Sequence, residues 1–427
     1  MTRGSYKLSL RVLLPLLLLA VVSAGTTPTH AQAPPSKNSC LDCHSIMPEP
    51  LGVTTEQFTA DIHSQKGFTC ANCHGGDPAS DDPTVSMGRA AGFKGKIARA
   101  QVPALCASCH SNAAMIRRYN PSLRTDQFSQ YQTSVHGQLL VRGNSKVAVC
   151  TDCHSVHGIR PASDSRSSVH PVNVAKTCAR CHADSDYMKG FSIPTDQFAS
   201  YSASVHHEAL TVRGDLSAPT CTTCHGNHGA APPGVASVEN VCATCHVFQA
   251  QLFDTSRHKE AFAAMQLPGC VTCHSNHRIQ RPSDDMIGTN AEAVCITCHS
   301  DGDAGFAAAA NMRAQLDGLV KAIHQAQEVL DRAEQSGMEI SGPKLNQAQA
   351  RDALTKARVT IHSFQPGRVA EDIQEGLKAS SANLQAGMEA LAERDYRRIG
   401  LAVSLLTIVL VLIALRLYIR KIENPNP

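Results

Sequence analysis

Residues 150–157 spell Cys-Thr-Asp-Cys-His-Ser-Val-His, and the first five positions of this stretch recur along the chain up to residue 299. The pattern Cys-x-x-Cys-His occurs nine times and includes all 18 cysteines of the 427-residue chain. The cysteine pairs are Cys40 and Cys43, Cys70 and Cys73, Cys106 and Cys109, Cys150 and Cys153, Cys178 and Cys181, Cys221 and Cys224, Cys242 and Cys245, Cys270 and Cys273, and Cys295 and Cys298. The histidines that follow them are His44, His74, His110, His154, His182, His225, His246, His274 and His299.

The spacing within each motif fits the covalent attachment of haem. Two thiols three residues apart add to the two vinyl groups of a haem, and the adjacent histidine coordinates the iron from one face. A zinc site takes four ligands from paired motifs, and a disulfide scaffold needs no histidine after each cysteine pair. The sequence therefore predicts nine covalently bound haem c groups, with the 18 cysteines as attachment points and the nine motif histidines as iron ligands.

Further histidines recur at fixed places around these motifs. Residues 125–136 and 195–206 share the pattern Thr-Asp-Gln-Phe-x-x-Tyr-x-x-Ser-Val-His, and a weaker copy ends at His258. Four histidines lie upstream of a motif, namely His63, His136, His206 and His258. Three others trail a motif histidine by three positions, namely His157, His228 and His277. Because they keep this register, we expect these seven to be sixth ligands of iron rather than ordinary surface histidines.

This recurrence divides the motif region into one leading motif at Cys40 and four two-haem modules. Each module consists of an upstream histidine, a motif with a trailing histidine, and a second motif. The first module is degenerate, because Gly-Gly follows its motif at Cys70 and the trailing histidine is missing.

Nine irons need nine sixth ligands, so two positions stay unassigned. The candidates are His170, His207, His324 and His362, with Met87 and Met115 as weaker ones. One iron without a protein ligand is the remaining alternative. His30 is expected to leave with the N-terminal signal.

The composition favours a core built from haem rather than from aromatic side chains. Aromatic residues make up 4% of the chain and Trp is absent, although aromatic side chains usually dominate a core. We therefore expect a mainly α fold with much irregular chain, in which a haem-packed region at residues 32–302 precedes a helical bundle. The formal net charge of +3 gives no indication of nucleic acid binding.

Residues 303–398 lack cysteine and have helical periodicity. Apolar residues mark one face of a first helix at residues 304–335, and a turn separates it from a second helix at residues 344–364. Gln-Pro-Gly at residues 365–367 breaks the chain, and a third helix runs from residue 368 towards an apolar segment. The pattern predicts an antiparallel helical bundle.

The N-terminus has the features of a secretory signal peptide. Three basic residues among the first 11 precede an apolar run, and small residues follow it. We predict a signal peptide within residues 1–31, with cleavage after Ala24 or Ala31. An uncleaved N-terminal anchor is the alternative, but the apolar run is short for a membrane span.

The apolar segment at residues 399–419 is long enough to span a bilayer as one helix. A buried helix of a soluble domain is the alternative. Basic residues flank both ends, so the signal peptide rather than charge bias sets the orientation. We expect a single-pass protein of the inner membrane, with the haem region in the periplasm and residues 420–427 as a cytoplasmic tail.

The series of Ser-Val-His, Cys-x-x-Cys-His-x-x-His and Cys-x-x-Cys-His between Cys40 and His299 resembles the bacterial multihaem c-type cytochromes. That class includes tetrahaem and octahaem cytochromes and the relatives of pentahaem nitrite reductase and hydroxylamine oxidoreductase. The resemblance implies a nonahaem cytochrome c domain in which the seven recurrent histidines are distal ligands; a looser match covers residues 361–377. The Cys-x-x-Cys-Lys motif of many nitrite reductases is missing from this sequence. The quinol dehydrogenases of this class carry an N-terminal anchor, whereas the predicted anchor here is C-terminal.

Two functions fit these features. The first is electron transport in a respiratory chain, between the membrane quinol pool and periplasmic or outer-membrane redox proteins. A single membrane helix cannot form a deep quinone pocket, so this function needs a membrane quinol-oxidising subunit of the cytochrome b or iron–sulfur type as partner. The alternative is a multihaem oxidoreductase that converts a small nitrogen or sulfur species at a five-coordinate haem. A filament-forming cytochrome fits less well, because a membrane anchor argues against a free filament.

Overall fold

The computed structural model describes residues 37–229 and 238–423. Every regular element in these two ranges is helical, as expected for a mainly α fold. The predicted signal peptide and His30 lie outside the described residues, as do the last four residues of the predicted tail.

The chain divides into two compact units, and the division falls within the motif region. The first unit comprises residues up to Thr55 together with Phe68–Lys96, and the second comprises Glu56–Gly67 together with the chain from Ile97 onwards. The described elements of the first unit are α1 (Ser39–His44), α4 (Cys70–His74), α5 (Pro83–Ser86) and η1 (Arg89–Ala91). Its two segments meet where the amide and hydroxyl of Ser39 both donate to the carbonyl of Pro78, each at 3.0 Å.

The motif region of the second unit consists of short helices joined by irregular chain. They are α2 (Thr55–Ala60), α3 (Ile62–Gln65), η2 (Arg99–Gln101), α6 (Val102–His110), α7 (Ala113–Tyr119), α8 (Gln127–Thr133), α9 (Val135–Val141), α10 (Cys150–His154), α11 (Pro171–His182), α12 (Gln197–Ser202), α13 (Val205–Thr211), α14 (Cys221–His225), η3 (Val238–Thr244), α15 (Val247–Asp254), α16 (Arg257–Ala264), α17 (Gly269–His274), η4 (Asp284–Met286) and η5 (Val294–Thr297). This arrangement confirms the expected mixture of short helices and irregular chain.

The sequence repeat is also a structural repeat. Tyr131 donates its hydroxyl to the carbonyl of Ala148 at 2.8 Å, and Tyr201 makes the same bond to Pro219 at 2.9 Å. In both copies, the serine of Ser-Val-His caps the next helix: Ser134 is the N-cap of α9 and Ser204 is the N-cap of α13. The cap explains the motif, because a serine hydroxyl satisfies a free amide of the first turn and thereby fixes the histidine two positions later.

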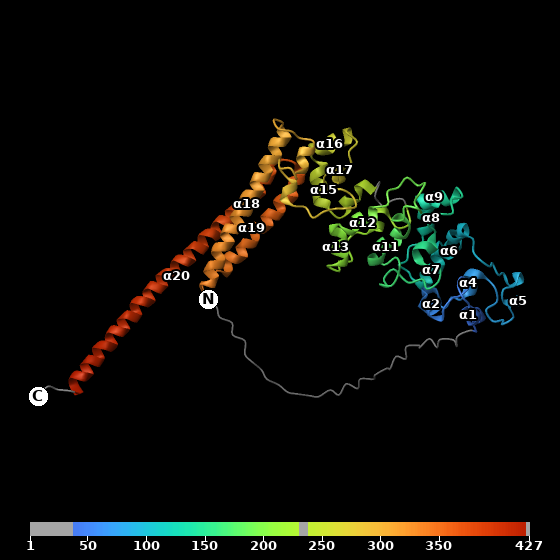
Figure 1. Ribbon diagram of the computed structural model, residues 1–427, viewed down its shortest axis with the longest axis horizontal. Helices are drawn as coiled ribbons and strands as arrows, with labels where there is room; N and C mark the ends of the chain where they lie inside the picture. The colour runs from blue at the N-terminus through green and yellow to red at the C-terminus, as the bar shows by residue number, and fades with distance from the viewer. Residues whose placement is uncertain (1–36, 230–237, 424–427) are drawn as a thin grey trace, which may run out of the picture. The chain divides into compact units, whose positions relative to one another are not determined.

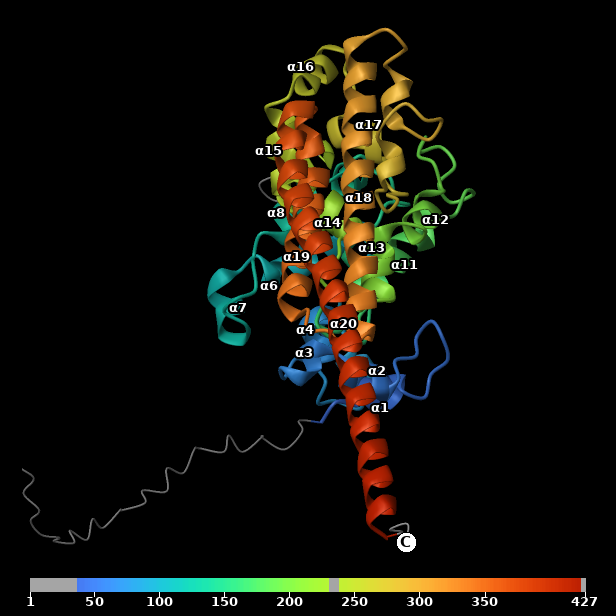
Figure 2. The same ribbon diagram turned by 90° about the vertical axis from the view of Figure 1, so that its left-hand side faces the viewer.

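The C-terminal part forms a three-helix bundle. Its elements are α18 (Ala304–Gln335), α19 (Ser341–Thr360), η6 (Ile361–Ser363) and α20 (Pro366–Glu423). Leu316 and Leu319 of α18 are fully buried against Leu354 of α19 and Val369 of α20. Figures 1 and 2 show the three helices side by side, with α20 continuing past the other two. The first helix was predicted with the bounds observed, and the third does run without interruption into the apolar segment.

The apolar segment at residues 399–419 is exposed along its whole length. It lies within α20, which is long and apolar enough to cross a membrane. The same helix therefore contributes to the bundle core in its first half and presents an apolar surface in its second half.

A buried polar network fixes the register of the bundle. Asn383 donates to the side-chain oxygen of Gln347 at 2.7 Å and accepts from Asn346 at 2.9 Å. Gln347 in turn donates to the main-chain carbonyl of Ile323 at 2.9 Å. Both Asn383 and Gln347 are almost completely buried, so each hydrogen bond replaces one that water would otherwise make.

Replacing Asn383 by Ala is expected to lower the free energy of unfolding by about 1–3 kcal/mol, because the buried side-chain oxygen of Gln347 and the half-buried amide of Asn346 would both lose their partner. Thermal unfolding followed by circular dichroism measures the loss. Gln385→Ala, at an exposed position on the same helix, is the control and should leave the transition within about 0.5 kcal/mol. Equal effects of the two variants would contradict a role for the network.

Candidate haem-ligand sites

In most motifs Cys-x-x-Cys-His forms one α-helical turn, which brings its two cysteines to the same side. In three of them a hydrogen bond joins the two sides of the turn. The side chain of the residue directly before the second cysteine accepts it from the main-chain amide of the residue directly before the first cysteine. Asp152 accepts from Val149 at 2.7 Å, Asn72 from Thr69 at 2.7 Å, and Thr223 from Thr220 at 3.1 Å. These bonds close the turn, and all 18 cysteines are free of disulfides, so the thiols are placed for bonds to one haem.

Two motifs depart from this helical geometry. Cys242 and Cys295 lie in the 3-10 helices η3 and η5, which end one residue before the second cysteine, so that Cys245 and Cys298 follow the helix. The amide of Cys245 donates to the carbonyl of Cys242 at 3.3 Å, and that of Cys298 to Cys295 at 3.3 Å. A bond between residues three apart is the 3-10 pattern. The same carbonyls also accept from the motif histidines four positions on, at 2.9 Å from His246 and 3.0 Å from His299, so each 3-10 turn ends in one α-type bond.

The polypeptide covers the predicted attachment cysteines only in part. The second cysteine is exposed in five motifs, at Cys43, Cys73, Cys153, Cys245 and Cys298. Cys181 is half-buried at the end of α11, as are the other twelve cysteines. Structural cysteines are usually among the most buried residues, but a helix of one turn supplies few side chains to cover them. Burial therefore gives no support to Cys43, Cys73, Cys153, Cys245 and Cys298. They stay predicted attachment points because of their spacing, as does the half-buried Cys181.

The chain turns sharply after the first motif of each module. Ser155, Gly226 and Ser275 directly follow the motif histidine, and their φ angles are 74°, 79° and 65°. Non-glycine residues rarely adopt positive φ, so two serines in this conformation mark a constrained turn. Gly75 holds the equivalent place with φ of 69°, and a Cβ there would lie 2.0 Å from the carbonyl oxygen of Gly92. The turn separates the trailing histidine from the motif that precedes it.

Seven motif histidines of the second unit each have another imidazole ring opposite them. The distances between ring centres are 6.0 Å for His63–His110, 6.1 Å for His136–His182, 6.2 Å for His154–His228, 6.4 Å for His206–His246, 5.9 Å for His225–His277, 6.0 Å for His258–His299 and 6.0 Å for His274–His362. Two imidazoles bound to one metal from opposite sides lie about 6 Å apart, because each metal–nitrogen bond is about 2 Å long. The residues present therefore fit bis-histidine haem iron.

The pairs follow one rule. The upstream histidine of a module lies opposite the second motif of the same module, as in His136–His182. The trailing histidine lies opposite the first motif of the preceding module, as in His154–His228 and His225–His277. Six of the seven histidines predicted as distal ligands take part in these pairs. The prediction for His157, which holds the place of His228 in its own module, stays a prediction.

The candidates for the unassigned ligands differ in their surroundings. His362 lies opposite His274, whereas the side chain of His170 accepts from the amide of Val172 and caps α11. The ring of His207 packs edge-on against Tyr201, and His324 is exposed on α18. The sequence offered His362 only as one of several candidates, because its surroundings match no part of the histidine repeat.

Burial keeps these imidazoles in the form that binds metal. It lowers the pKa of ten histidines of the pairs, because a low-dielectric environment disfavours the charged ring. They are His110, His136, His154, His182, His206, His225, His228, His258, His274 and His362. Only the neutral imidazole donates a nitrogen lone pair to iron, so this shift favours ligation.

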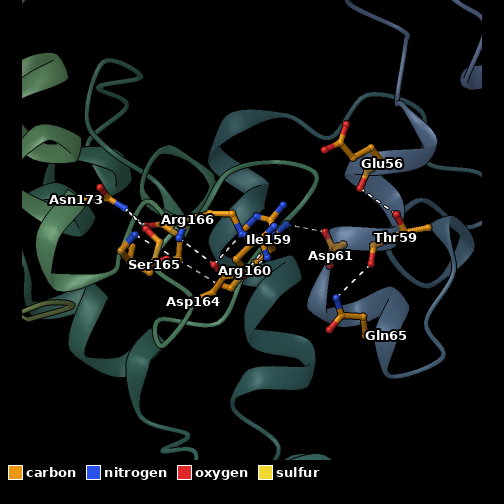
Figure 3. A network of polar contacts seen from close by, with 12 residues as sticks. Glu56, Thr59, Asp61, Gln65, Ile159, Arg160, Asp164, Ser165, Arg166 and Asn173 are labelled. Atoms are coloured by element: carbon orange, nitrogen blue, oxygen red, sulfur yellow. Dashed lines mark hydrogen bonds and ion pairs between the residues drawn. The ribbon is translucent and has the colours of Figure 1, made fainter.

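Asp61 orients His63, the predicted distal histidine of the first module. Its carboxylate lies 3.0 Å from Nδ1 of His63, which leaves Nε2 for iron. It also accepts the amide of Ile159 at 2.9 Å, and the amide of Ile62 donates to the carbonyl of Ile159 at 2.7 Å. Figure 3 shows Asp61 beside Ile159. Next to them lie Arg160 and Arg166, which both form ion pairs with Asp164. Burial raises the pKa of Asp61, but the hydrogen bonds from His63 and Ile159 outweigh it, and the net pKa is lowered.

Asp61→Asn is expected to raise the reduction potential of the haem attached at Cys106 and Cys109. A carboxylate on Nδ1 makes the ring a stronger donor and stabilises ferric iron. Loss of such a partner typically lowers the affinity for the metal about tenfold or more. For a one-electron couple tenfold corresponds to about 59 mV. Potentiometric titration followed by absorbance measures the shift, with the exposed Asp215→Asn as control. Unchanged potentials in Asp61→Asn would contradict this role.

The comparisons with known proteins cover parts of the same region. The cytochrome c3 family matches residues 62–183, which hold four of the nine motifs. The doubled CXXCH motif family matches residues 262–304, which hold the last two. No curated protein and no solved structure gives a significant match. The chain thus contains a cytochrome c3-like domain and paired CxxCH motifs for covalent haem c, and these support a multihaem c-type cytochrome with a role in electron transfer.

Proposed function

We propose that this protein is a membrane-anchored periplasmic cytochrome with nine haem c groups that carries electrons between the quinol pool and periplasmic or outer-membrane redox proteins. The histidine pairs are the observation that supports it most strongly. A pair such as His154–His228 fills both axial positions of its iron, which leaves no site for a substrate and suits electron transfer. Since the two histidines come from consecutive modules, the same pairs hold neighbouring haem sites together.

The proposed location rests on the two ends of the chain. The predicted signal peptide within residues 1–31 exports the haem region, and α20 carries the exposed apolar segment that is long enough to span the inner membrane. One membrane helix offers no deep quinone pocket of its own. The proposal therefore includes a membrane quinol-oxidising subunit of the cytochrome b or iron–sulfur type as electron donor.

Reduction of the haems in membranes tests this function. In membranes from the native host, a quinol should reduce the haems of the full-length protein within the time of turnover. The purified protein in vesicles, without other subunits, should stay oxidised with the same quinol but accept electrons from dithionite. Fast reduction of the purified protein would contradict the need for a partner, and lack of reduction in native membranes would contradict the link to the quinol pool.

The leading motif supports a second candidate function, an oxidoreductase acting on a small nitrogen or sulfur species. Nδ1 of His44 lies 2.8 Å from the carbonyl oxygen of Leu51, which orients Nε2 towards iron. Among the described residues of the first unit, no imidazole ring lies opposite that of His44. The side chains of Ile46 and Leu51 beside it are exposed, so a small molecule would have access to this haem.

Ligand binding distinguishes the two functions. A five-coordinate haem at His44 predicts a high-spin signal in electron paramagnetic resonance that shifts on addition of nitrite, hydroxylamine or sulfite. Replacing Cys40 and Cys43 by Ser should abolish that signal. A purely low-spin spectrum that ignores all three compounds would exclude this second function.

A further inference from the structure

A tight turn between α19 and α20 lies against the last haem module. It consists of η6 and Phe364, whose φ of 55° places a bulky residue in the left-handed region. The amide of Phe364 donates to the carbonyl of Ile361 at 2.7 Å, and the side chains of Ile361 and Ser363 are buried. A bulky residue in this conformation needs support from its surroundings, which here are the helices of the bundle and the last module.

His362 projects from this turn towards a motif histidine. Its ring centre lies 6.0 Å from that of His274, with an angle of 20° between the rings. The pairs made by the trailing histidines are similar, with angles of 5° for His154–His228 and 16° for His225–His277. Nδ1 of His362 lies 2.9 Å from the carbonyl oxygen of Val359, so this nitrogen carries the proton and Nε2 is the one available to iron.

The position of His362 completes the rule that the other pairs follow. The first motif of a module takes its opposing histidine from the next module, but no module follows the one that contains Cys270 and His274. His362 takes that place from the helical bundle, although its sequence context, Thr-Ile-His-Ser-Phe, has nothing in common with a haem motif.

Ion pairs hold the bundle on the same module. Arg358 of α19 binds the carboxylate of Asp284 with two bonds of 2.9 and 2.7 Å. Arg313 of α18 donates to the carbonyl of Asp284 at 2.8 Å and pairs with Asp285 at 3.0 Å. Because Asp284 lies between the last two motifs, these contacts fix the bundle to the module that His362 faces.

Phe364 covers the distal histidine of the neighbouring haem site. Its ring stacks on that of His258 at 3.8 Å with an angle of 30°, and His258 itself faces His299 at 6.0 Å. Nδ1 of His258 is buried and has no hydrogen-bond partner among the described residues. The aromatic ring thus shields this imidazole from water.

We propose that the helical bundle is part of the haem-binding machinery: His362 is the sixth ligand of the haem attached at Cys270 and Cys273, and Phe364 shields His258 of the adjacent haem. Both residues belong to the turn that leads into α20. Their role in electron transfer rests on the proposed anchoring of α20 in the membrane. The haems at Cys270 and Cys295 are then the two that are linked directly to the membrane helix. Electrons pass through them between a membrane partner and the other haems.

The first test is His362→Ala in the purified full-length protein. The haem at Cys270 should change from low-spin to high-spin, so that one of the haems gives a high-spin signal in electron paramagnetic resonance. Added imidazole should restore the low-spin state, because it replaces the missing ligand. His324→Ala, an exposed histidine on α18, is the matched control and should leave the spectrum unchanged. An unchanged spectrum for His362→Ala, or a high-spin signal that imidazole leaves in place, would overturn the proposal.

Two further variants keep the test decisive if His362→Ala is unstable. His362→Met should stay six-coordinate and gain the near-infrared band of methionine-bound ferric haem; absence of that band in a protein with full haem content would overturn the assignment. In a protein with Cys270 and Cys273 replaced by Ser, His362→Ala should add no high-spin signal, and an added signal would place His362 on another haem. These measurements need neither membranes nor a quinol, so their failure is distinguishable from failure of the proposed electron transport.

Discussion

His228→Ala is expected to convert the haem attached at Cys150 and Cys153 from low-spin to high-spin, while the haem of its own motif at Cys221 stays low-spin. The reason is the observed pair: His228 lies 6.2 Å from His154, with the two rings nearly parallel at 5°. Loss of this ring leaves the iron of His154 with one protein ligand. Electron paramagnetic resonance and carbon monoxide binding to the reduced protein both measure the change.

Two controls locate the affected haem. His207→Ala removes a histidine that packs on Tyr201, and it should leave all haems low-spin. In a protein with Cys150 and Cys153 replaced by Ser, His228→Ala should produce no new high-spin signal. If the signal persists in that background, His228 serves a different haem and the rule of ligation between modules is wrong.

Deleting residues 399–427 is expected to move the protein from the membrane fraction to the soluble periplasmic fraction. Each Leu, Ile or Val in a membrane span contributes roughly 0.3–0.6 kcal/mol to insertion, so the segment contributes on the order of 5 kcal/mol. Each 1.4 kcal/mol is a tenfold change in partition, which makes the redistribution essentially complete. Fractionation followed by haem staining measures it.

A deletion of residues 424–427 alone is the matched control and should leave the protein in the membrane. The shorter protein without residues 399–427 should keep its low-spin spectrum, because the bundle up to residue 398 retains His362 and the core of α18, α19 and α20. Membrane retention of the shorter protein would point to an uncleaved N-terminal anchor instead.

The sequence alone predicted the haem attachment sites and determined the class of fold. Cys-x-x-Cys-His is a local pattern, in which five consecutive residues in one turn of the chain carry the whole chemistry, so no knowledge of distant contacts is needed. The bundle was predictable for a similar reason: helical periodicity predicted residues 304–335 as one helix, with the bounds that α18 has. The prediction for the second helix, residues 344–364, was wrong at both ends. α19 already begins at Ser341, and residues 361–364 continue the apolar pattern but form a 3-10 turn with a left-handed residue.

Only the tertiary structure decided which histidines face each other. His154 and His228 are 74 positions apart, and His274 and His362 are 88 apart, so their pairing depends on how the modules and the bundle pack. The positive φ angles at Ser155, Gly226 and Ser275 are part of the reason, because they turn the chain after a motif histidine and separate the trailing histidine from it. The same applies to His362, which the sequence could not rank above His170, His207 or His324. Local spacing thus predicted where haem attaches, whereas packing between segments distant in sequence determined which second imidazole ring faces each motif histidine.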